Sequence, residues 1–144
     1  MKYLFVFLLL GLVSCGDASS NASENVKPKL KEYSMDEVTT PNDTMFLKKD
    51  MKPVTGIVRA WYENGQLYQK RNYIDGLDDG LQRAWHENGQ LALEANFKDD
   101  KLISNRLWYE DGQLEYECNW KDGKLINEKC WNEDGTLKEC EYKQ

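Results

Sequence analysis

The sequence predicts an all-β fold, an elongated antiparallel meander of repeated β-hairpins. The motif Trp-x-Glu-(Asn/Asp)-Gly-x-Leu occurs four times, and its first residues are 24, 23 and 23 positions apart. A fixed period of this length indicates supersecondary units that stack on one another. Each copy holds an Asn-Gly or Asp-Gly pair, the strongest local signal for a hairpin turn. Polar and apolar residues alternate after the second and third copies, as in a strand with one buried face.

The first turn of each unit is expected to be a type I turn in which the glycine has positive φ and forms a bulge. A second short polar turn closes the units, at 75–80, 98–101 and 121–124. Two turns per unit, with no helical stretch between them, leave an up-and-down meander as the simplest topology. The repeat-defining residues are Trp61, Gly65, Leu67, Trp85, Gly89, Leu91, Trp108, Gly112, Leu114, Trp131, Gly135 and Leu137.

The tryptophans of the four copies are expected to pack as the core. A one-layer sheet must bury some apolar surface, and each indole buries a large area. The alternative is a row of exposed rings that stack on sugars or other flat ligands.

Residues 1–14 read as a lipoprotein signal peptide. Lys2 supplies a positive charge, and the apolar run from Leu4 to Val13 is too short to cross a bilayer, which takes about 20 helical residues. Leu12-Val13-Ser14-Cys15 resembles the lipobox of bacterial lipoproteins, which implies that Cys15 is lipidated. The alternative is an ordinary secretory signal followed by an incidental cysteine. By the same resemblance, Gly16 after the cysteine favours the outer membrane over the inner one.

Residues 15–44 are expected to form the lipidated cysteine and a disordered tether, because they offer little apolar surface to offset the entropy of ordering. A short amphipathic helix at 30–38 is the alternative. The repeat domain is expected to span 45–144. It begins with the second half of a unit, since Gly56 precedes Trp61 by the same spacing as Gly80 precedes Trp85, and it ends with a partial unit that acts as a cap.

The four copies, together with Pro53-x-Thr55-Gly56 and the Asp-Gly turns, resemble the variant MORN repeat. Residues 45–144 as a whole resemble the antitoxin-like proteins of the YwqK family. The resemblance implies a β-hairpin array and suggests an antitoxin-like function. The sequence departs from the pattern at His86 and Asn132, which replace the usual second aromatic residue, and at 98–101, where the turn glycine is absent.

The sequence contains no recognisable catalytic, cofactor or metal site. His86 is the only histidine, which excludes a multi-histidine metal centre, and it occupies the place of Tyr62 and Tyr109 in their copies. The acidic turns lack the spacing of known calcium loops, so aspartate is expected there as a turn former. The net charge is −6 and no basic stripe is visible, so nucleic acid and anionic lipid headgroups are not expected partners.

Three cysteines remain after Cys15. In a meander Cys118 and Cys140 lie on strands that are not adjacent, about 9.6 Å or more apart, whereas a disulfide needs Cα atoms within about 7 Å. Any internal bridge should therefore include Cys130. Cys130–Cys140 is favoured because it closes the shorter loop, and three reduced cysteines are the alternative.

These observations predict a membrane-anchored, non-catalytic repeat lipoprotein that binds a protein partner in the bacterial cell envelope. One alternative is an antitoxin or immunity protein that neutralises a toxin. Another is a glycan or cell-wall binding module that uses the repeated aromatic residues. The sequence does not identify the ligand-binding residues.

Overall fold

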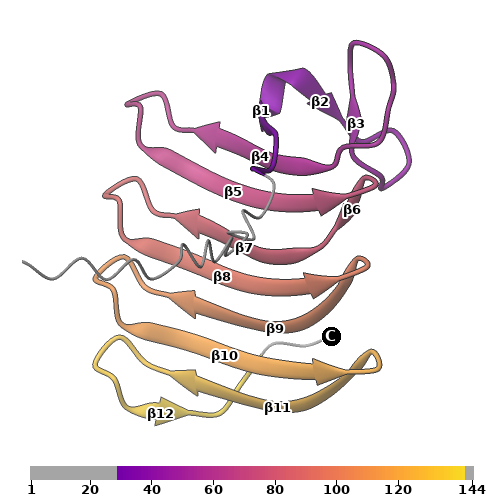
Figure 1. Ribbon diagram of the computed structural model, residues 1–144. Coiled ribbons are helices and arrows are strands. Elements are labelled where there is room, and N and C mark those ends of the chain that lie inside the picture. Colours follow the sequence, from indigo (N-terminus) through magenta and orange to yellow (C-terminus); the bar gives the residue numbers. More distant parts are fainter. Residues whose placement is uncertain (1–28, 142–144) are drawn as a thin grey trace, which may run out of the picture.

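The computed structural model describes residues 29–141 and shows one long, single-layer sheet of stacked hairpins (Figure 1). The sheet has ten strands, in the order β1-β4-β5-β7-β8-β9-β10-β11-β12, and β6 pairs with β5. Every neighbouring pair from β4 to β12 is antiparallel. The predicted all-β meander is therefore confirmed. Among the described residues, no helix has the length and apolar character needed to cross a membrane.

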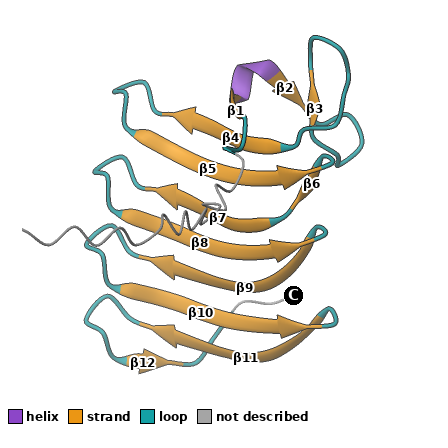
Figure 2. Cartoon of the chain, in the orientation of Figure 1, coloured by secondary structure: helices purple, strands orange, loops and turns teal. Residues whose placement is uncertain are grey.

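The strands of the array alternate with two kinds of turn, which lie at opposite ends of the strands (Figure 2). Its strands are β4 (Gly56–Trp61), β5 (Leu67–Ile74), β6 (Leu77–Asp78), β7 (Gly80–Trp85), β8 (Leu91–Lys98), β9 (Lys101–Trp108), β10 (Leu114–Lys121), β11 (Lys124–Trp131) and β12 (Leu137–Lys138).

The first kind of turn has the predicted geometry. The φ angles of Gly65, Gly89, Gly112 and Gly135 are 85°, 86°, 88° and 81°. In the first turn the amide of Gly65 donates to the carbonyl oxygen of Tyr62, and the amide of Tyr62 donates to that of Gln66. The other three turns repeat both bonds. Positive φ favours glycine here because a Cβ atom would be strained in that conformation.

The turn at 98–101 keeps the hairpin without a glycine. Asp99 and Asp100 have φ of 48° and 61°, close to the values of 51° and 73° for Asp122 and Gly123 in the next unit. Aspartate tolerates the left-handed conformation better than most residues, which explains why this departure from the repeat leaves the turn intact.

The N-terminal part of the described chain differs from the sequence expectation. Residues 29–44 were expected to belong to a disordered tether, but they contain β1 (Glu32–Ser34), a short 3₁₀ helix η1 (Met35–Glu37) and β2 (Val38–Thr39). β1 adds to β4 in parallel, and β2 pairs with β3 (Phe46–Leu47) in a separate two-stranded sheet. The few apolar residues of this stretch are placed against the end of the array, so long-range packing supplies what local composition lacks. The expected half-unit therefore contributes only β4 to the main sheet.

One face of the sheet is buried and the opposite face is polar. Pairing in register places Val58, Tyr73, Gln82, Ala95, Tyr116, Cys118 and Cys130 on the same side, and all of them are buried. We call this side the core face and the opposite side the polar face. Two clusters make up the core, one at each end of the array.

Candidate binding surface

The core face is covered at both ends. At the N-terminal end Val38, Met45, Leu47 and Val54 pack with Val58 and Tyr73. At the other end Cys140, from the segment that follows β12, packs on the cluster of Tyr116, Cys118 and Cys130. The segments outside the array thus act as partial second layers. Between the two clusters the core face has no such cover among the described residues.

The uncovered middle of the core face contains a shallow cavity of about 320 Å³. Leu93, Ala95, Phe97 and Leu102, from β8 and β9, give it apolar walls. This volume falls at the small end of the range for ligand pockets. Leu93, Phe97 and Leu102 are only partly buried, so the cavity offers apolar surface to a partner.

Polar side chains beside the cavity form hydrogen bonds with one another. The Nε atom of Arg71 donates to Oε1 of Gln82 at 2.7 Å, and its Nη2 donates to Oδ2 of Asp78 at 2.5 Å. Tyr73 lies in the same group, and burial raises the pKa of its hydroxyl far above the usual value. Oδ1 of Asp78 and Nε2 of Gln82 are buried without a hydrogen-bond partner among the described residues. These bonds join β5, β6 and β7 beside the cavity.

A repeated hydrogen bond joins each unit to the next, close to the turns that contain Gly65, Gly89 and Gly112. The hydroxyl of Tyr62 donates to the carbonyl oxygen of Trp85 at 2.9 Å, and that of Tyr109 donates to the carbonyl oxygen of Trp131 at 2.8 Å. Nε2 of His86 lies 2.8 Å from the carbonyl oxygen of Trp108, in the same geometry. His86 therefore has a structural role, and the second aromatic position is a connector between units.

The polar face carries a row of charges that crosses the sheet one strand at a time. From β7 to β11 the row is Arg83, Glu94, Arg106, Glu117 and Lys129, and each residue lies opposite the next. Each neighbouring pair forms an ion pair, at 2.9, 3.9, 3.7 and 3.7 Å. Lys70 breaks the alternation, because it lies opposite both Arg59 and Arg83.

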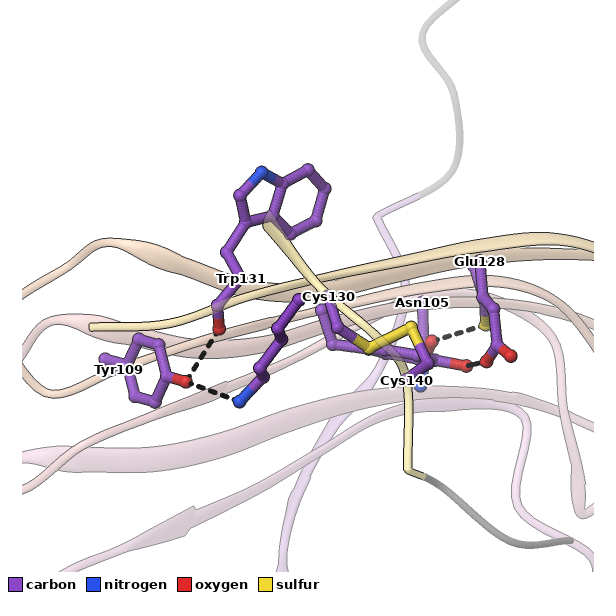
Figure 3. The surroundings of a disulfide bond; sticks show 9 residues. Asn105, Tyr109, Glu128, Cys130, Trp131 and Cys140 are labelled. Atoms are coloured by element: carbon purple, nitrogen blue, oxygen red, sulfur yellow. Dashed lines mark hydrogen bonds between the residues drawn. A yellow bond between two sulfur atoms is a disulfide. The ribbon is translucent and has the colours of Figure 1, made fainter. Parts of the chain in front are cut away.

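The tryptophans do not form the core, which corrects the sequence expectation. Trp61 is 51% exposed, and Trp85, Trp108 and Trp131 are half-buried. Figure 3 shows the indole of Trp131 on the side of the sheet opposite to Tyr109 and the disulfide bond. The core side of each unit is instead filled by smaller or less apolar residues such as Val58, Gln82 and Ala95. The covering segments supply the second layer that the prediction assumed to be missing.

The structure joins Cys130 and Cys140 in a disulfide with Cα atoms 5.3 Å apart (Figure 3). Cys118 is a free, buried thiol that donates to Oδ1 of Asn105. Tyr116 packs in the same cluster and donates to Oε2 of Glu128 at 3.1 Å, and burial raises the pKa of its hydroxyl. The disulfide ties the C-terminal segment to the core face. Oxidation of this pair in the protein stays a prediction.

The aspartates of the acidic turns form hydrogen bonds with other residues of the chain. Nζ of Lys98 donates to Oδ2 of Asp79 at 2.7 Å, and this bond holds the pKa of Asp79 below its usual value. The amide of Asp78 donates to Oδ1 of Asp100 at 2.5 Å. No group of three or more His, Cys, Asp or Glu side chains within 29–141 is placed to hold a metal ion. These aspartates therefore connect neighbouring turns.

The hairpin units are similar to a known family of repeats. Three stretches, residues 54–75, 78–99 and 105–122, match the MORN repeat variant. Three hairpins of the chain are therefore similar to this repeat. The matched stretches correspond to β4–β5, β7–β8 and most of β9–β10. No curated protein and no solved structure matches the chain significantly.

Every repeat-defining residue lies in a hairpin that matches the MORN repeat variant or in the hairpin that follows the last matched one. The last hairpin, β11–β12, lies beyond the matched stretches, and β12 has only two residues. Cys15, the expected lipidation site, lies outside the described residues, as do residues 142–144 of the expected end cap.

Sequence reasoning missed the cavity and the connectors between units. The connector is visible in the sequence as a residue with a polar tip directly after each of the first three tryptophans: Tyr62, His86 and Tyr109. Arg71 and Asp78 have no repeated counterpart in the other units, so periodicity contains no signal for them, whereas the place of Gln82 is taken by the polar residues Asn105 and Glu128 in the next two units.

Proposed function

We propose that this chain is a lipid-anchored, non-catalytic module that binds a protein partner in the bacterial cell envelope through the middle of its core face. The observation that supports the binding site is the gap between the two core clusters. There a MORN sheet presents Leu93, Phe97 and Leu102 around a cavity of about 320 Å³. Apolar surface left without a second layer of protein is a common mark of an interaction site.

The anchoring part of the proposal rests on Cys15 and the lipobox-like residues before it. Three acyl chains on this cysteine exceed the two signals that stable membrane attachment needs. Replacement of Cys15 by Ser should move the protein from the detergent phase to the aqueous phase. A parent protein that already partitions into water would contradict anchoring.

The binding part is tested by affinity capture of the native lipoprotein under mild detergent. Leu93→Arg should abolish capture of a specific partner, because it places a charge in the cavity. Leu81→Arg is the matched control, since Leu81 lies on the polar face and is 38% exposed. Equal capture by both variants would reject the core face as the binding site. If the captured protein is a toxin, the chain acts as an antitoxin or immunity protein.

A second candidate function is favoured by one observation, the exposure of Trp61 at the start of the tryptophan column. Trp61 is 51% exposed, and the half-buried indoles of Trp85, Trp108 and Trp131 follow it along the array. Exposed indole faces stack on sugar rings. Pull-down with purified cell-wall glycan tests this candidate, with Trp61→Ala expected to weaken binding and Leu93→Arg to leave it unchanged.

A further inference from the structure

The N-terminal end of the array gathers lysines from two separate segments. Lys29 and Lys31 precede β1, whereas Lys49 and Lys52 belong to the loop after β3. These four lysines line one open cavity of about 580 Å³, and Asp50 is the only acidic side chain among the described residues that line it. The lining therefore carries a net charge of +3, in a protein whose net charge is −6.

Apolar side chains are exposed within the same region. Leu30 is 48% exposed and lines the cavity, and Met51, between Asp50 and Lys52, is 53% exposed. We call Lys29, Leu30, Lys31, Lys49, Met51 and Lys52 the basic patch. Lysines around exposed apolar side chains are the combination found on surfaces that lie in the headgroup region of a membrane.

The patch is built on backbone that is fixed to the sheet. The amide of Ile57 donates to the carbonyl oxygen of Lys31 at 2.8 Å. Gly56 permits this approach, since a Cβ atom there would lie 2.4 Å from that oxygen. On the other segment, the amide of Leu47 donates to the carbonyl oxygen of Lys52 at 2.9 Å, which closes the lysine-rich loop. The charges therefore meet through the fold, which explains why no basic stripe is visible in the sequence.

The position of the patch in the chain identifies its partner. Only 14 residue steps separate Cys15 from Lys29, a distance of at most about 50 Å along an extended chain. An anchor at Cys15 would hold the patch close to the membrane at high effective concentration. We propose that the basic patch binds the surface of an anionic phospholipid bilayer and orients the array on it. This inference rests on the anchoring part of the proposed function.

Vesicle binding by the chain from residue 15 onward, with Cys15→Ser so that no acyl chain contributes, tests the proposal. The probes are vesicles of phosphatidylcholine and vesicles that also contain phosphatidylglycerol. Binding is expected only to the anionic vesicles and is expected to weaken with salt. Lys29→Gln, Lys31→Gln, Lys49→Gln and Lys52→Gln together should weaken it at least about tenfold, since each lysine contributes near an anionic surface.

The matched control neutralises four exposed lysines on β9, β10 and β11, away from the basic patch: Lys101, Lys121, Lys124 and Lys129. It changes the net charge equally and should weaken binding much less. Equal loss in both variants, or no binding of the parent to anionic vesicles at low salt, would overturn the proposal. Leu30→Asn with Met51→Asn should weaken binding without any change of charge, and unchanged binding would reject the apolar contribution. Detergent partition of the acylated protein tests the anchor separately, so failure of the patch and failure of anchoring are distinguishable.

Discussion

Nε2 of His86 reaches the next hairpin unit, 2.8 Å from the carbonyl oxygen of Trp108, just as the hydroxyls of Tyr62 and Tyr109 reach the carbonyl oxygens of Trp85 and Trp131. Histidine and tyrosine share one property at this position, a polar tip on a flat ring. The repeat therefore preserves a hydrogen bond between units at this position.

His86→Phe should lower the free energy of unfolding by about 1 kcal/mol, because it leaves the carbonyl oxygen of Trp108 without this donor. His86→Tyr should keep the bond and stay within about 0.5 kcal/mol of the parent. Tyr62→Phe serves as a second example of the same loss. Urea unfolding followed by tryptophan fluorescence measures all three. Equal stability of the Phe and Tyr variants at position 86 would show that the bond contributes nothing.

Gly76 and Gly65 have nearly the same φ, 83° and 85°, but different surroundings. A Cβ atom on Gly76 would lie 2.4 Å from Cγ2 of Thr44 and 2.8 Å from the carbonyl oxygen of Met45, whereas one on Gly65 would meet no atom within 4 Å. Gly65→Ala should cost about 1 kcal/mol through backbone strain alone.

Gly76→Ala should cost about 1–3 kcal/mol more, since the N-terminal segment must move away from the sheet. Thermal or urea unfolding compares the two variants directly. Equal costs would mean that residues 44–45 are not docked on this turn.

Lys70 occupies the place in the charge row where Glu94 and Glu117 stand in the next two units. Lys70→Glu should raise the free energy of unfolding by about 0.5–1 kcal/mol, because it replaces two like-charge neighbours by two ion pairs. Lys129→Glu makes the same change of net charge in the same row. It should lower stability, since Glu117 lies opposite. A stabilising effect of both substitutions would show that net charge, and not the row, is responsible.

The disulfide predicts a specific pattern of cysteine reactivity. Peptide mapping of the unreduced protein should recover Cys130 joined to Cys140, with Cys118 alkylated only after unfolding because it is 2% exposed. Reduction should lower the free energy of unfolding by about 2–3 kcal/mol for a loop of this length. A bridge between Cys118 and Cys140 would contradict the strand order.

The hairpin units could be predicted from the sequence, whereas the segments that pack on their core face could not. The Asn-Gly and Asp-Gly pairs require positive φ, which only a few residues tolerate, so the turns and the period could be predicted locally. The burial of the tryptophans could not be predicted locally, because it depends on which face of the sheet is covered by other segments of the chain. That layer comes from residues such as Val38 and Met45, far from the repeats in sequence.

The candidate site was hidden for a related reason. Phe97 and Leu102 look like ordinary core residues in the alternating pattern, and they line a cavity because, within 29–141, the covering segments do not reach the middle of the sheet. The basic patch likewise joins segments that are separate in the sequence. Both surfaces are consequences of tertiary packing at the ends of the array.

Site-specific photo-crosslinking in intact cells shows whether a partner protein binds the middle of the core face. A photoreactive phenylalanine analogue at Phe97 reports on the middle of the core face, and the same analogue at Leu81 reports on the polar face of the adjacent strand. Binding through the core face predicts one defined crosslinked protein from position 97 and none from position 81. A crosslink from position 81 alone, or none from position 97 in cells where affinity capture recovers the partner, would contradict it.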